Sequence, residues 1–392
     1  MTATGRPARL LVVDDLEVNR DLLARRLTQQ GHEVEMAVNG REALDVLRSG
    51  REFDLVLLDV MMPEMDGYQV LEALRADPVL RSLPVIMVSA VTEIESVVRC
   101  LEAGAEDYLP KPFNPVLLRA RVGSSLEKKR LRDRERLYAK SLERELEIGH
   151  NIQKSFLPQS LPAAPGWEIA ARLKAARQVG GDFYDAFALS GGGIGLAVGD
   201  ICDKGVGAAL FVALVRTLLR ATAQRLAVDH PGDADRVVKE PVTLTSDYVA
   251  RTHGETNMFA TLFFAALDPA TGSLVWLNAG HEPPYLRRAS GALERLEPTA
   301  GAVGLMPDGV FRLARTTVAP GDTLLAFTDG VTDARDPDGL LFGPERLEAL
   351  VAEPETSAAD LVARIEAAVD AHARGAEPAD DVALLAVRRS LP

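Results

Sequence analysis

RLLVVDD, at residues 9–15, is a short apolar run that ends in two aspartates. FDLVLLD, at residues 53–59, repeats the pattern and ends in Asp59. A carboxylate beside a dry strand resists desolvation unless another group offsets its charge. The two stretches therefore predict buried strands that run into a charged site.

Around these stretches, short apolar runs alternate with helical periodicity from residue 9 to about residue 122. Three further runs read as strands: HEVEMA (32–37), LPVIMVS (83–89) and EDYL (106–109). Four segments read as helices, mostly closed by Gly or Asp: residues 18–31, 40–50, 67–77 and 93–105. Five strands alternating with helices predict an α/β doubly wound, five-stranded parallel sheet, with its site at the carboxyl ends of the strands.

The composition limits the class of protein. The chain has 392 residues, a net charge of -13 and two cysteines, which argues against a nucleic-acid or anionic-membrane surface and against a disulfide framework. The start, MTATGRPARLLVVDD, reaches aspartates before a signal-peptide core could form, and no apolar run was expected to approach membrane-spanning length. These features predict a cytoplasmic protein that binds neither nucleic acid nor membrane.

A long exposed helix is expected between two domains. LEKKRLRDRERLYAKSLERELE (126–147) is mostly charged with intermittent leucines, which favours a solvated helix face and a dimeric coiled coil over a DNA-binding arm. FLPQSLPAAPG (156–166) then breaks the helix. The predicted organisation is a first domain at residues 1–124, a helical linker at 125–158 and a second domain at 159–392.

Beyond Trp167, strand-like runs follow one another without intervening helices, and helical stretches cluster in two blocks near residues 207–226 and 357–373. This pattern predicts an α+β domain, an antiparallel β-sandwich flanked by helices.

The first acidic site gathers side chains from several strand ends. Asp14, Asp15 and Asp59 would repel one another strongly unless a cation joined them. A hard divalent ion such as Mg²⁺ suits such oxygen ligands and lets Asp59 act as a nucleophile towards a phosphoryl donor. Lys111 supplies a fixed positive charge, and Ser89 supplies a hydroxyl.

These segments resemble the receiver domain of two-component response regulators. The motifs that carry the resemblance are VVDD (12–15), LLDVMMPEMDG (57–67), VSA (88–90) and DYLPKPF (107–113). The resemblance implies that Asp59 is phosphorylated by a cognate histidine kinase. It also implies that Asp15, Asp59 and the Met61 carbonyl hold Mg²⁺ with Asp14 nearby, that Ser89 and Tyr108 form a switch with Lys111, and that the Lys111–Pro112 peptide is cis.

A second acidic set lies in the later domain. Its motifs are VGGDFYD (179–185), GDICDKGVGAAL (199–210), FTDGVTDA (327–334) and PADDVALL (378–385). Carboxylates of this kind could hold two divalent ions that share a water, lower its pKa and aim it at a phosphate ester. Glycines beside them would let the backbone approach the ions closely.

The order of these motifs resembles the PPM-type metal-dependent serine/threonine phosphatases, in their SpoIIE/RsbU-like branch. MFATLFFAALD (258–268), LNAGHEPP (277–284) and LFGPERL (341–347) also match. The resemblance implies that two Mn²⁺ or Mg²⁺ ions are held by Asp182, Asp200, Asp329, Asp380 and the carbonyl of Ile201. It makes Arg177 a candidate phosphate contact, and leaves Asp381 to orient its neighbour.

The same resemblance implies a partner. The substrate would be phosphoserine or phosphothreonine on a STAS-domain anti-sigma-factor antagonist in a partner-switching pathway. The continuous helix pattern and its intermittent leucines separately suggest a homodimer formed by linker and receiver, through which phosphorylation of Asp59 would control the second domain. Three residues depart from relatives: Cys202, Asp203 and Ala383. An alternative is a catalytically silent module that binds its partner in a phosphorylation-dependent way, which the four retained aspartates disfavour. A DNA-binding regulator would need a basic recognition surface, which the later domain lacks.

Overall fold

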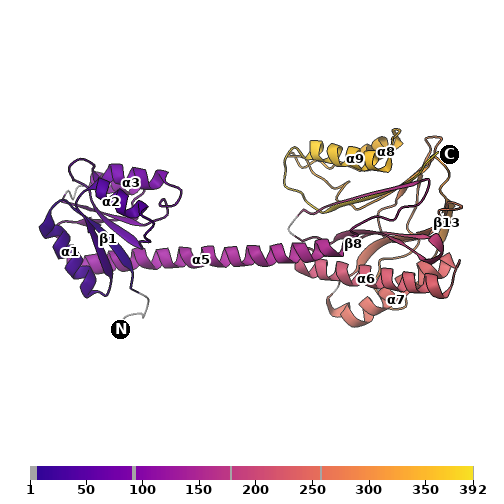
Figure 1. Ribbon diagram of the computed structural model, residues 1–392, viewed down its shortest axis with the longest axis horizontal. Helices are drawn as coiled ribbons and strands as arrows, with labels where there is room; N and C mark the ends of the chain where they lie inside the picture. The colour runs from indigo at the N-terminus through magenta and orange to yellow at the C-terminus, as the bar shows by residue number, and fades with distance from the viewer. Residues whose placement is uncertain (1–6, 91–93, 177–178, 257, 392) are drawn as a thin grey trace. The chain divides into compact units, whose positions relative to one another are not determined.

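The computed structural model describes residues 7–90, 94–176, 179–256 and 258–391. The chain forms two units, Met1–Leu142 and Glu143–Pro392, each with its own cores. The helix α5 (Pro115–Phe156) runs through the boundary between them (Figure 1). Asn114 caps its start, because Oδ1 accepts the Val116 N–H at 2.9 Å. The domain limits at residues 124 and 158 stay a prediction.

The first unit is a parallel sheet in the order β2-β1-β3-β4-β5. Its strands are β1 (Arg9–Val13), β2 (Glu33–Ala37), β3 (Leu55–Asp59), β4 (Val85–Ser89) and β5 (Asp107–Pro110). The helices that alternate with them are α1 (Glu17–Gln29), α2 (Gly40–Arg48), α3 (Gly67–Ala76) and α4 (Ile94–Glu102). The predicted doubly wound, five-stranded parallel sheet is confirmed.

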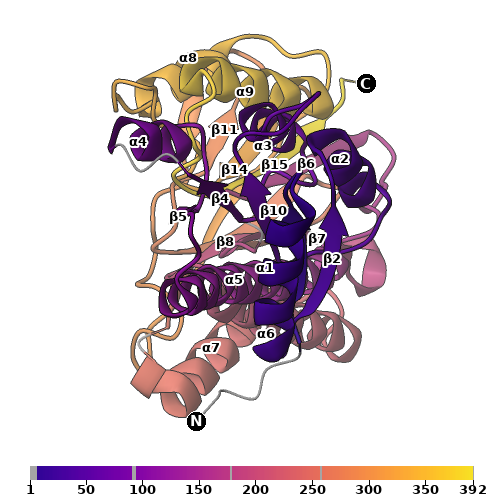
Figure 2. The same cartoon turned by 90° about the vertical axis from the view of Figure 1, so that its left-hand side faces the viewer.

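Helices cover both faces of this sheet, and the alternation of strand side chains decides which face each residue joins. Leu10 and Val12 lie in the core with α1 and the first turns of α5, whereas Leu11 and Val13 lie in the core with α2, α3 and α4. Figure 2 shows the two helical layers on opposite sides of the sheet. Both faces are dry, so polar side chains concentrate at the strand ends.

The second unit contains two antiparallel five-stranded sheets. One has the order β13-β10-β9-β8-β7 and the other the order β12-β11-β14-β15-β6. The strands are β6 (Trp167–Lys174), β7 (Asp182–Ala188), β8 (Ile194–Ile201), β9 (Ala260–Leu267), β10 (Ser273–Ala279), β11 (Tyr285–Arg287), β12 (Leu293–Arg295), β13 (Ala314–Thr317), β14 (Thr323–Phe327) and β15 (Val382–Arg389). The core between the sheets takes Val198 and Phe263 from the first and Leu324 and Leu385 from the second.

Two pairs of helices cover the outer faces, as Figure 1 shows. They are α6 (Val206–Asp229) and α7 (Ala234–His253) on the first sheet, and α8 (Pro344–Ala352) and α9 (Ala358–Ala373) on the second. Short 3₁₀ turns lie at Ser190–Gly192 and Gly254–Thr256. The antiparallel sandwich flanked by helices is therefore confirmed.

The expectation of only two helical blocks in this unit is wrong, because α7 and α8 are helical as well. Pro241 inside α7 is a residue that normally ends a helix, and neighbouring valines lower helix propensity. Packing overrides both effects, since Val237, Val238 and Val242 are buried against the core beneath α6 and α7. α8 is only nine residues long and begins at a proline, which hides it in the sequence.

The expectation that no apolar run approaches membrane-spanning length is also wrong. Within the described part of the chain, α6 is one helix that is long and apolar enough to cross a membrane, with a mean hydropathy of 1.6 in its most apolar window. Its composition has a packing explanation, because Val212, Val215 and Leu219 line the core under the first sheet. Arg216 and Arg220 on the same helix pair with the buried Asp185 of β7, at 3.0 and 3.3 Å.

Candidate functional site

The first site lies at the carboxyl ends of the receiver strands. Oxygens of Asp14, Asp15 and Asp59 lie within 4.8 Å of one another, close enough to share one cation. Lys111 Nζ lies 2.7 Å from Asp14 Oδ2 and 2.9 Å from Asp59 Oδ1. The structure thus brings together four of the residues that the sequence pointed to.

The electrostatics of this pocket favour a bound cation. Burial raises the pKa of Asp59, and the charges of Asp14 and Asp15 raise it further, against the Lys111 hydrogen bond. Burial lowers the pKa of Lys111, but its hydrogen bonds to Asp14 and Asp59 outweigh that effect and leave it raised. One ammonium group cannot neutralise three carboxylates, so the donor set fits a hard divalent ion.

The remaining receiver residues lie beside this pocket. Ser89 ends β4 and is buried, and the buried Tyr108 donates its hydroxyl to the Ser89 carbonyl at 3.4 Å. The Lys111–Pro112 peptide is cis, as predicted. Met61 lies two residues after Asp59 with an exposed side chain. The roles of these residues as a switch and as a metal ligand stay predictions.

The second site lies at one edge of the sandwich. Asp182 begins β7 and pairs in register with Asp200 of β8, which places the two carboxylates on adjacent antiparallel strands. Asp329 follows β14 in the next turn, and Asp380 lies two residues before β15. β14 and β15 are neighbours in the other sheet, so both sheets contribute acidic groups to this edge.

The raised pKa values of these aspartates indicate that their carboxylates lie close to one another. Burial raises the pKa of Asp182 strongly, and the negative charge of Asp200 adds to the effect. Burial also raises the pKa of Asp200, with contributions from the charges of Asp329 and Asp380. For Asp329, burial and the charge of Asp380 raise the pKa together. Each member of the set therefore senses at least one other.

The residues fit bound cations. Asp182 Oδ2 is buried without a hydrogen-bond partner among the described residues. A Cβ on Gly181 would stand 2.8 Å from the Ile201 carbonyl oxygen and 3.2 Å from Asp200 Oδ1, so the glycine keeps this cradle open. The described carboxylates of this site do not include three whose oxygens all lie within 4.8 Å.

Asp381 has a different environment from its neighbour Asp380. Its buried carboxylate accepts backbone N–H groups from Ala176 at 2.8 Å, Gly181 at 2.7 Å and Asp182 at 3.4 Å. A Cβ on Gly180 would collide with it, at 1.9 Å from Oδ2. Asp381 thus holds the backbone that leads into Asp182.

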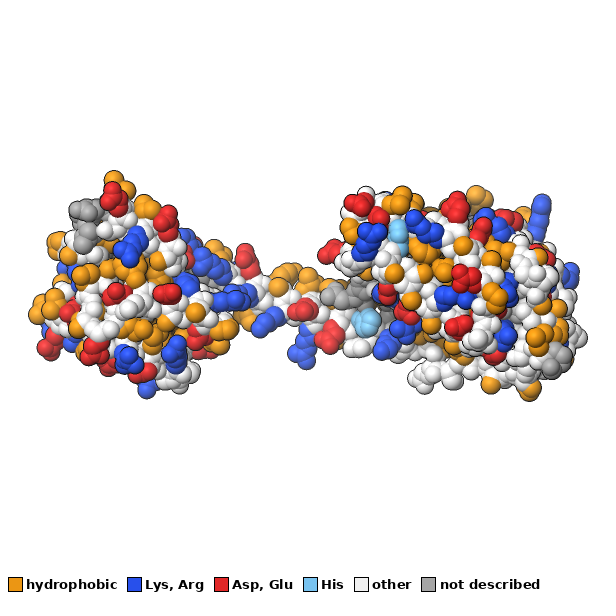
Figure 3. Space-filling model, turned by 90° about the horizontal axis from the view of Figure 1, so that it is seen from above, with side chains coloured by type: hydrophobic (Ala, Val, Ile, Leu, Met, Phe, Trp, Pro, Cys, Tyr) orange, Lys and Arg blue, Asp and Glu red, His pale blue; other side chains and the backbone are white. Residues whose placement is uncertain are grey.

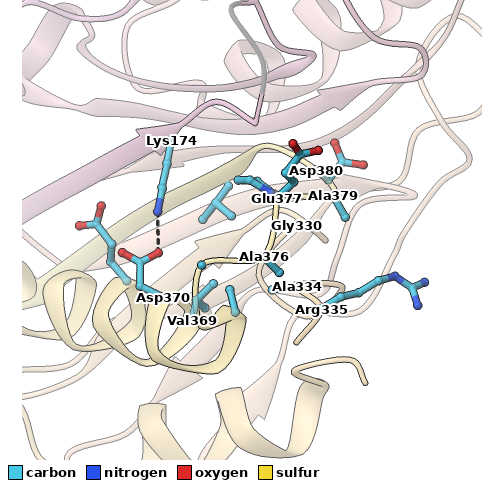
Figure 4. Close-up of a pocket in the computed structure, with 15 residues that line it drawn as sticks. Lys174, Gly330, Ala334, Arg335, Val369, Asp370, Ala376, Glu377, Ala379 and Asp380 are labelled. Carbon is cyan, nitrogen blue, oxygen red and sulfur yellow. Dashed lines mark hydrogen bonds and ion pairs between the residues drawn. The ribbon is translucent and has the colours of Figure 1, made fainter. Parts of the chain in front are cut away.

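Asp380 is half-buried and reaches outwards. Lys204 Nζ lies 2.8 Å from Asp380 Oδ2 and 2.9 Å from the Ala379 carbonyl oxygen. Figure 4 shows Asp380 and Gly330 beside a pocket of about 310 Å³, where Lys174 pairs with Asp370. Asp380 and its neighbours Pro378 and Ala379 are among the residues that line this pocket.

Other predicted residues have structural contacts or lie outside the description. Arg177 lies outside the described residues, so its role stays a prediction. Asn278 Oδ1 accepts the His281 N–H at 2.8 Å, and burial lowers the pKa of His281 to about 4. These are the contacts of a buried turn. Cys202 Sγ accepts the Phe259 N–H at 3.1 Å.

Two supporting residues were missed. Thr328 is fully buried, its hydroxyl accepts the Ala383 N–H at 2.8 Å, and a hydrogen bond from it lowers the pKa of Asp182. Its position directly before Asp329 is the sequence feature that could have identified Thr328 as part of the site. Gln153 of α5 contacts Gly180, and nothing in the surrounding charged sequence distinguishes it.

Comparison with known proteins agrees with this geometry. The family model for the response regulator receiver domain matches residues 10–123, and the model for stage II sporulation protein E (SpoIIE) matches residues 190–390. The second match includes Asp200, Asp329 and Asp380 but begins after Asp182. The fold and the sites define a receiver domain followed by a PP2C-type domain. Because the SpoIIE model covers more than half of its length, the chain belongs to the SpoIIE family.

Individual relatives match either part. Protein IcfG of Synechocystis sp. is 40% identical over 263 residues, which make up 63% of this chain and 42% of that protein. The response regulator PleD of Caulobacter vibrioides is 45% identical over 118 residues, or 30% of this chain and 26% of PleD. The solved SiaA-PP2C domain of Pseudomonas aeruginosa shares the fold with a TM-score of 0.52 at 23% identity, covering 64% of this chain and 98% of that one. The chain thus spans less than half of the two curated relatives.

Proposed function

We propose that the protein is a response regulator whose second domain hydrolyses phosphoserine or phosphothreonine on a partner protein in a metal-dependent reaction. The observation that carries the proposal is the register of Asp182 opposite Asp200, joined at the same edge by Asp329 and Asp380. Four crowded carboxylates, of which the described residues pair only Asp380 with a cationic side chain, Lys204, are costly unless metal ions use them.

The residues of the second site would have different roles. Asp182, Asp200, Asp329 and Asp380, with the carbonyl of Ile201, would hold two Mn²⁺ or Mg²⁺ ions. Ions of this kind lower the pKa of water and offset the charge of a phosphate ester. Asp381 fixes the direction of Asp182 through the backbone, as outer-shell groups commonly do. Lys204 Nζ pairs with Asp380 Oδ2 at 2.8 Å.

We further propose that the receiver controls this activity. Asp59 would accept a phosphoryl group from a cognate histidine kinase, with Mg²⁺ held by Asp15, Asp59 and the Met61 carbonyl beside Asp14. Lys111, Ser89 and Tyr108 would respond to the added charge.

The proposed dimer rests on α5. Several hydrophobic side chains on this helix are exposed: Leu131, Leu137, Tyr138, Leu142, Ile148 and Ile152. Figure 3 shows orange hydrophobic side chains among charged ones on this part of the chain. A second copy would cover them in a coiled coil. Light scattering tests the dimer, and the mass of a single chain would rule it out. The same measurement with and without beryllofluoride tests whether phosphorylation alters the dimer, and an unchanged mass with unchanged activity would rule out that control.

A STAS-domain anti-sigma-factor antagonist in a partner-switching pathway is the substrate we propose, and the cytoplasm is the proposed location. Both rest on the resemblance to RsbU-like phosphatases. A screen of phosphorylated STAS domains from the source genome against the purified protein tests the first. Hydrolysis of unrelated phosphoproteins at the same rate would count against it.

Hydrolysis of p-nitrophenyl phosphate by the full chain tests the activity itself. We expect hydrolysis that rises with Mn²⁺, stops in EDTA and is lost in Asp329→Asn. The matched control is Asp338→Asn, which changes an exposed aspartate nine residues later. Equal rates for wild type and Asp329→Asn would reject the metal assignment.

A further inference from the structure

A pocket of about 310 Å³ lies beside the proposed metal site, and the proposed chemistry does not use it. It is bordered by the last turns of α9, the start of β15 and the turn after β14. Figure 4 shows the Lys174–Asp370 pair at one side of the pocket and Asp380 at the other. Most of the other lining side chains are small and apolar: Ala334, Val369, Ala373, Ala376, Pro378 and Val382. This volume is at the lower end of the range of ligand pockets, which suits one side chain better than a whole small molecule.

Two chain segments form a wall that the pocket shares with the proposed metal site. Gly330, which follows the proposed ligand Asp329, lines the pocket, and so does the proposed ligand Asp380. The two segments are in contact, because a Cβ on Gly330 would stand 1.7 Å from the Asp381 carbonyl oxygen. A phosphoprotein whose phosphate reaches the metal ions would therefore place its neighbouring residues at the mouth of the pocket.

The charges around the pocket favour an aliphatic occupant. Three lining carboxylates have cationic partners, in the pairs Asp370–Lys174, Glu366–Arg172 and Asp380–Lys204. Arg335 donates to the Gly339 carbonyl oxygen at 3.2 Å. Glu377 is the lining carboxylate outside these pairs, and it is exposed. An acidic side chain brought to the pocket would meet the charge of Glu377, whereas an aliphatic side chain would be buried against the apolar walls.

We propose that this pocket is a specificity subsite, which binds an aliphatic side chain within about three residues of the phosphorylated serine or threonine of the substrate protein. The inference rests on the proposed function and adds a sequence preference to it. The short reach follows from the shared wall, since Asp380 borders both sites and each residue of an extended chain spans at most about 3.6 Å. Burial of the side chain would stabilise the bound substrate and its transition state alike, so the preference should appear in kcat/KM.

Phosphoserine peptides of otherwise alanine and glycine sequence test the proposal with the full chain in Mn²⁺. Leucine is placed in turn at each of the three positions on either side of the phosphoserine, and parallel sets carry aspartate or lysine there. Release of inorganic phosphate gives kcat/KM for each peptide. We expect leucine at one of these positions to raise kcat/KM by about tenfold over alanine, and aspartate at that position to lower it.

A variant that fills the pocket should remove the preference for leucine over alanine. Ala373→Leu does so from the last turn of α9, with a residue of good helix propensity. Ala371→Leu is the matched control, because it changes an exposed alanine about 200° away around the same helix and should keep the preference. Ala376→Phe fills the pocket from the loop and serves if Ala373→Leu does not fold.

Equal kcat/KM for all peptides, or a preference for lysine at these positions, would overturn the proposal. A leucine preference that both filling variants leave intact would overturn it as well. Hydrolysis of p-nitrophenyl phosphate, measured beside the peptides, separates this failure from that of the proposed function. If the wild type hydrolyses it in Mn²⁺ but does not discriminate among the peptides, the subsite alone fails. If the wild type hydrolyses neither, the phosphatase assignment fails too.

Discussion

Asp380 and Asp381 are adjacent in the chain, yet we expect their substitution to have different effects, one on metal binding and the other on stability. Asp381 is 5% exposed and accepts three backbone N–H groups, two of them at 2.8 and 2.7 Å. The side chain of Asp380 is 35% exposed and pairs with that of Lys204, which is 45% exposed. The first should therefore govern stability, and the second should govern metal binding.

The magnitudes follow from the contacts. A hydrogen bond to a charged group contributes about 1.5–3 kcal/mol, so loss of two short bonds in Asp381→Ala costs roughly 3–5 kcal/mol of unfolding free energy. Relief of the repulsion that the Asp381 charge exerts on Asp182 and Asp200 offsets part of this loss. Asp381→Asn keeps one acceptor oxygen and should lose about half as much. An exposed ion pair contributes about 0–1 kcal/mol, so Asp380→Asn should unfold almost as wild type does in EDTA.

Urea unfolding in EDTA, followed by tryptophan fluorescence, measures these differences. The only two tryptophans, Trp167 and Trp276, both lie in the second unit, so the signal reports that unit alone. p-Nitrophenyl phosphate hydrolysis is the second readout. There Asp380→Asn should lose more activity than Asp381→Asn, whose loss we place at about 10- to 100-fold. An unfolding free energy for Asp381→Ala equal to that of wild type, or a larger stability loss in Asp380→Asn, would refute the reasoning.

Three further predictions concern the acidic sites. Burial raises the pKa of Asp200 to about 7, above its unfolded value of about 3.9. The stability contributed by its protonated form is complete below about pH 4 and is lost by about pH 7, so the melting temperature in EDTA should fall across that window. Mn²⁺ should remove most of that fall, and a flat profile in EDTA would contradict the assignment. Gly181→Ala places a Cβ 2.8 Å from the Ile201 carbonyl oxygen and should weaken Mn²⁺ binding by at least about tenfold, as a titration would show. Asp59→Asn should abolish phosphorylation by acetyl phosphate in intact-mass spectra, and a labelled variant protein would disprove Asp59 as the acceptor.

Much of the fold could be predicted from the sequence because it follows the periodicity of hydrophobic residues. In the receiver, each strand alternates between two dry faces, so apolar runs ending in Asp15, Asp59 and Ser89 identify both the strands and their polar edge. In the second unit, long strands such as β6 and β10 account for the strand-like runs beyond Trp167. The three-residue strands β11 and β12 were missed because runs of this length carry no periodic signal.

For the phosphatase site, the sequence predicted the proposed metal ligands but not the residues that support them. The acidic residues next to strands, such as Asp200 and Asp329, stand out because a carboxylate is costly there. Their support comes from pairs far apart in sequence, such as Asp381 with Gly181, or Gln153 with Gly180. A local pattern cannot predict such pairs, since each partner alone has the composition of a loop or of an exposed helix.

Anomalous diffraction from a crystal soaked in Mn²⁺ would test the central claim most directly. We predict two anomalous peaks at the edge of the sandwich, within roughly 2.0–2.3 Å of oxygens from Asp182, Asp200, Asp329 and Asp380. The absence of any peak among these four side chains, in a crystal whose receiver binds Mn²⁺ at Asp15 and Asp59, would contradict the account.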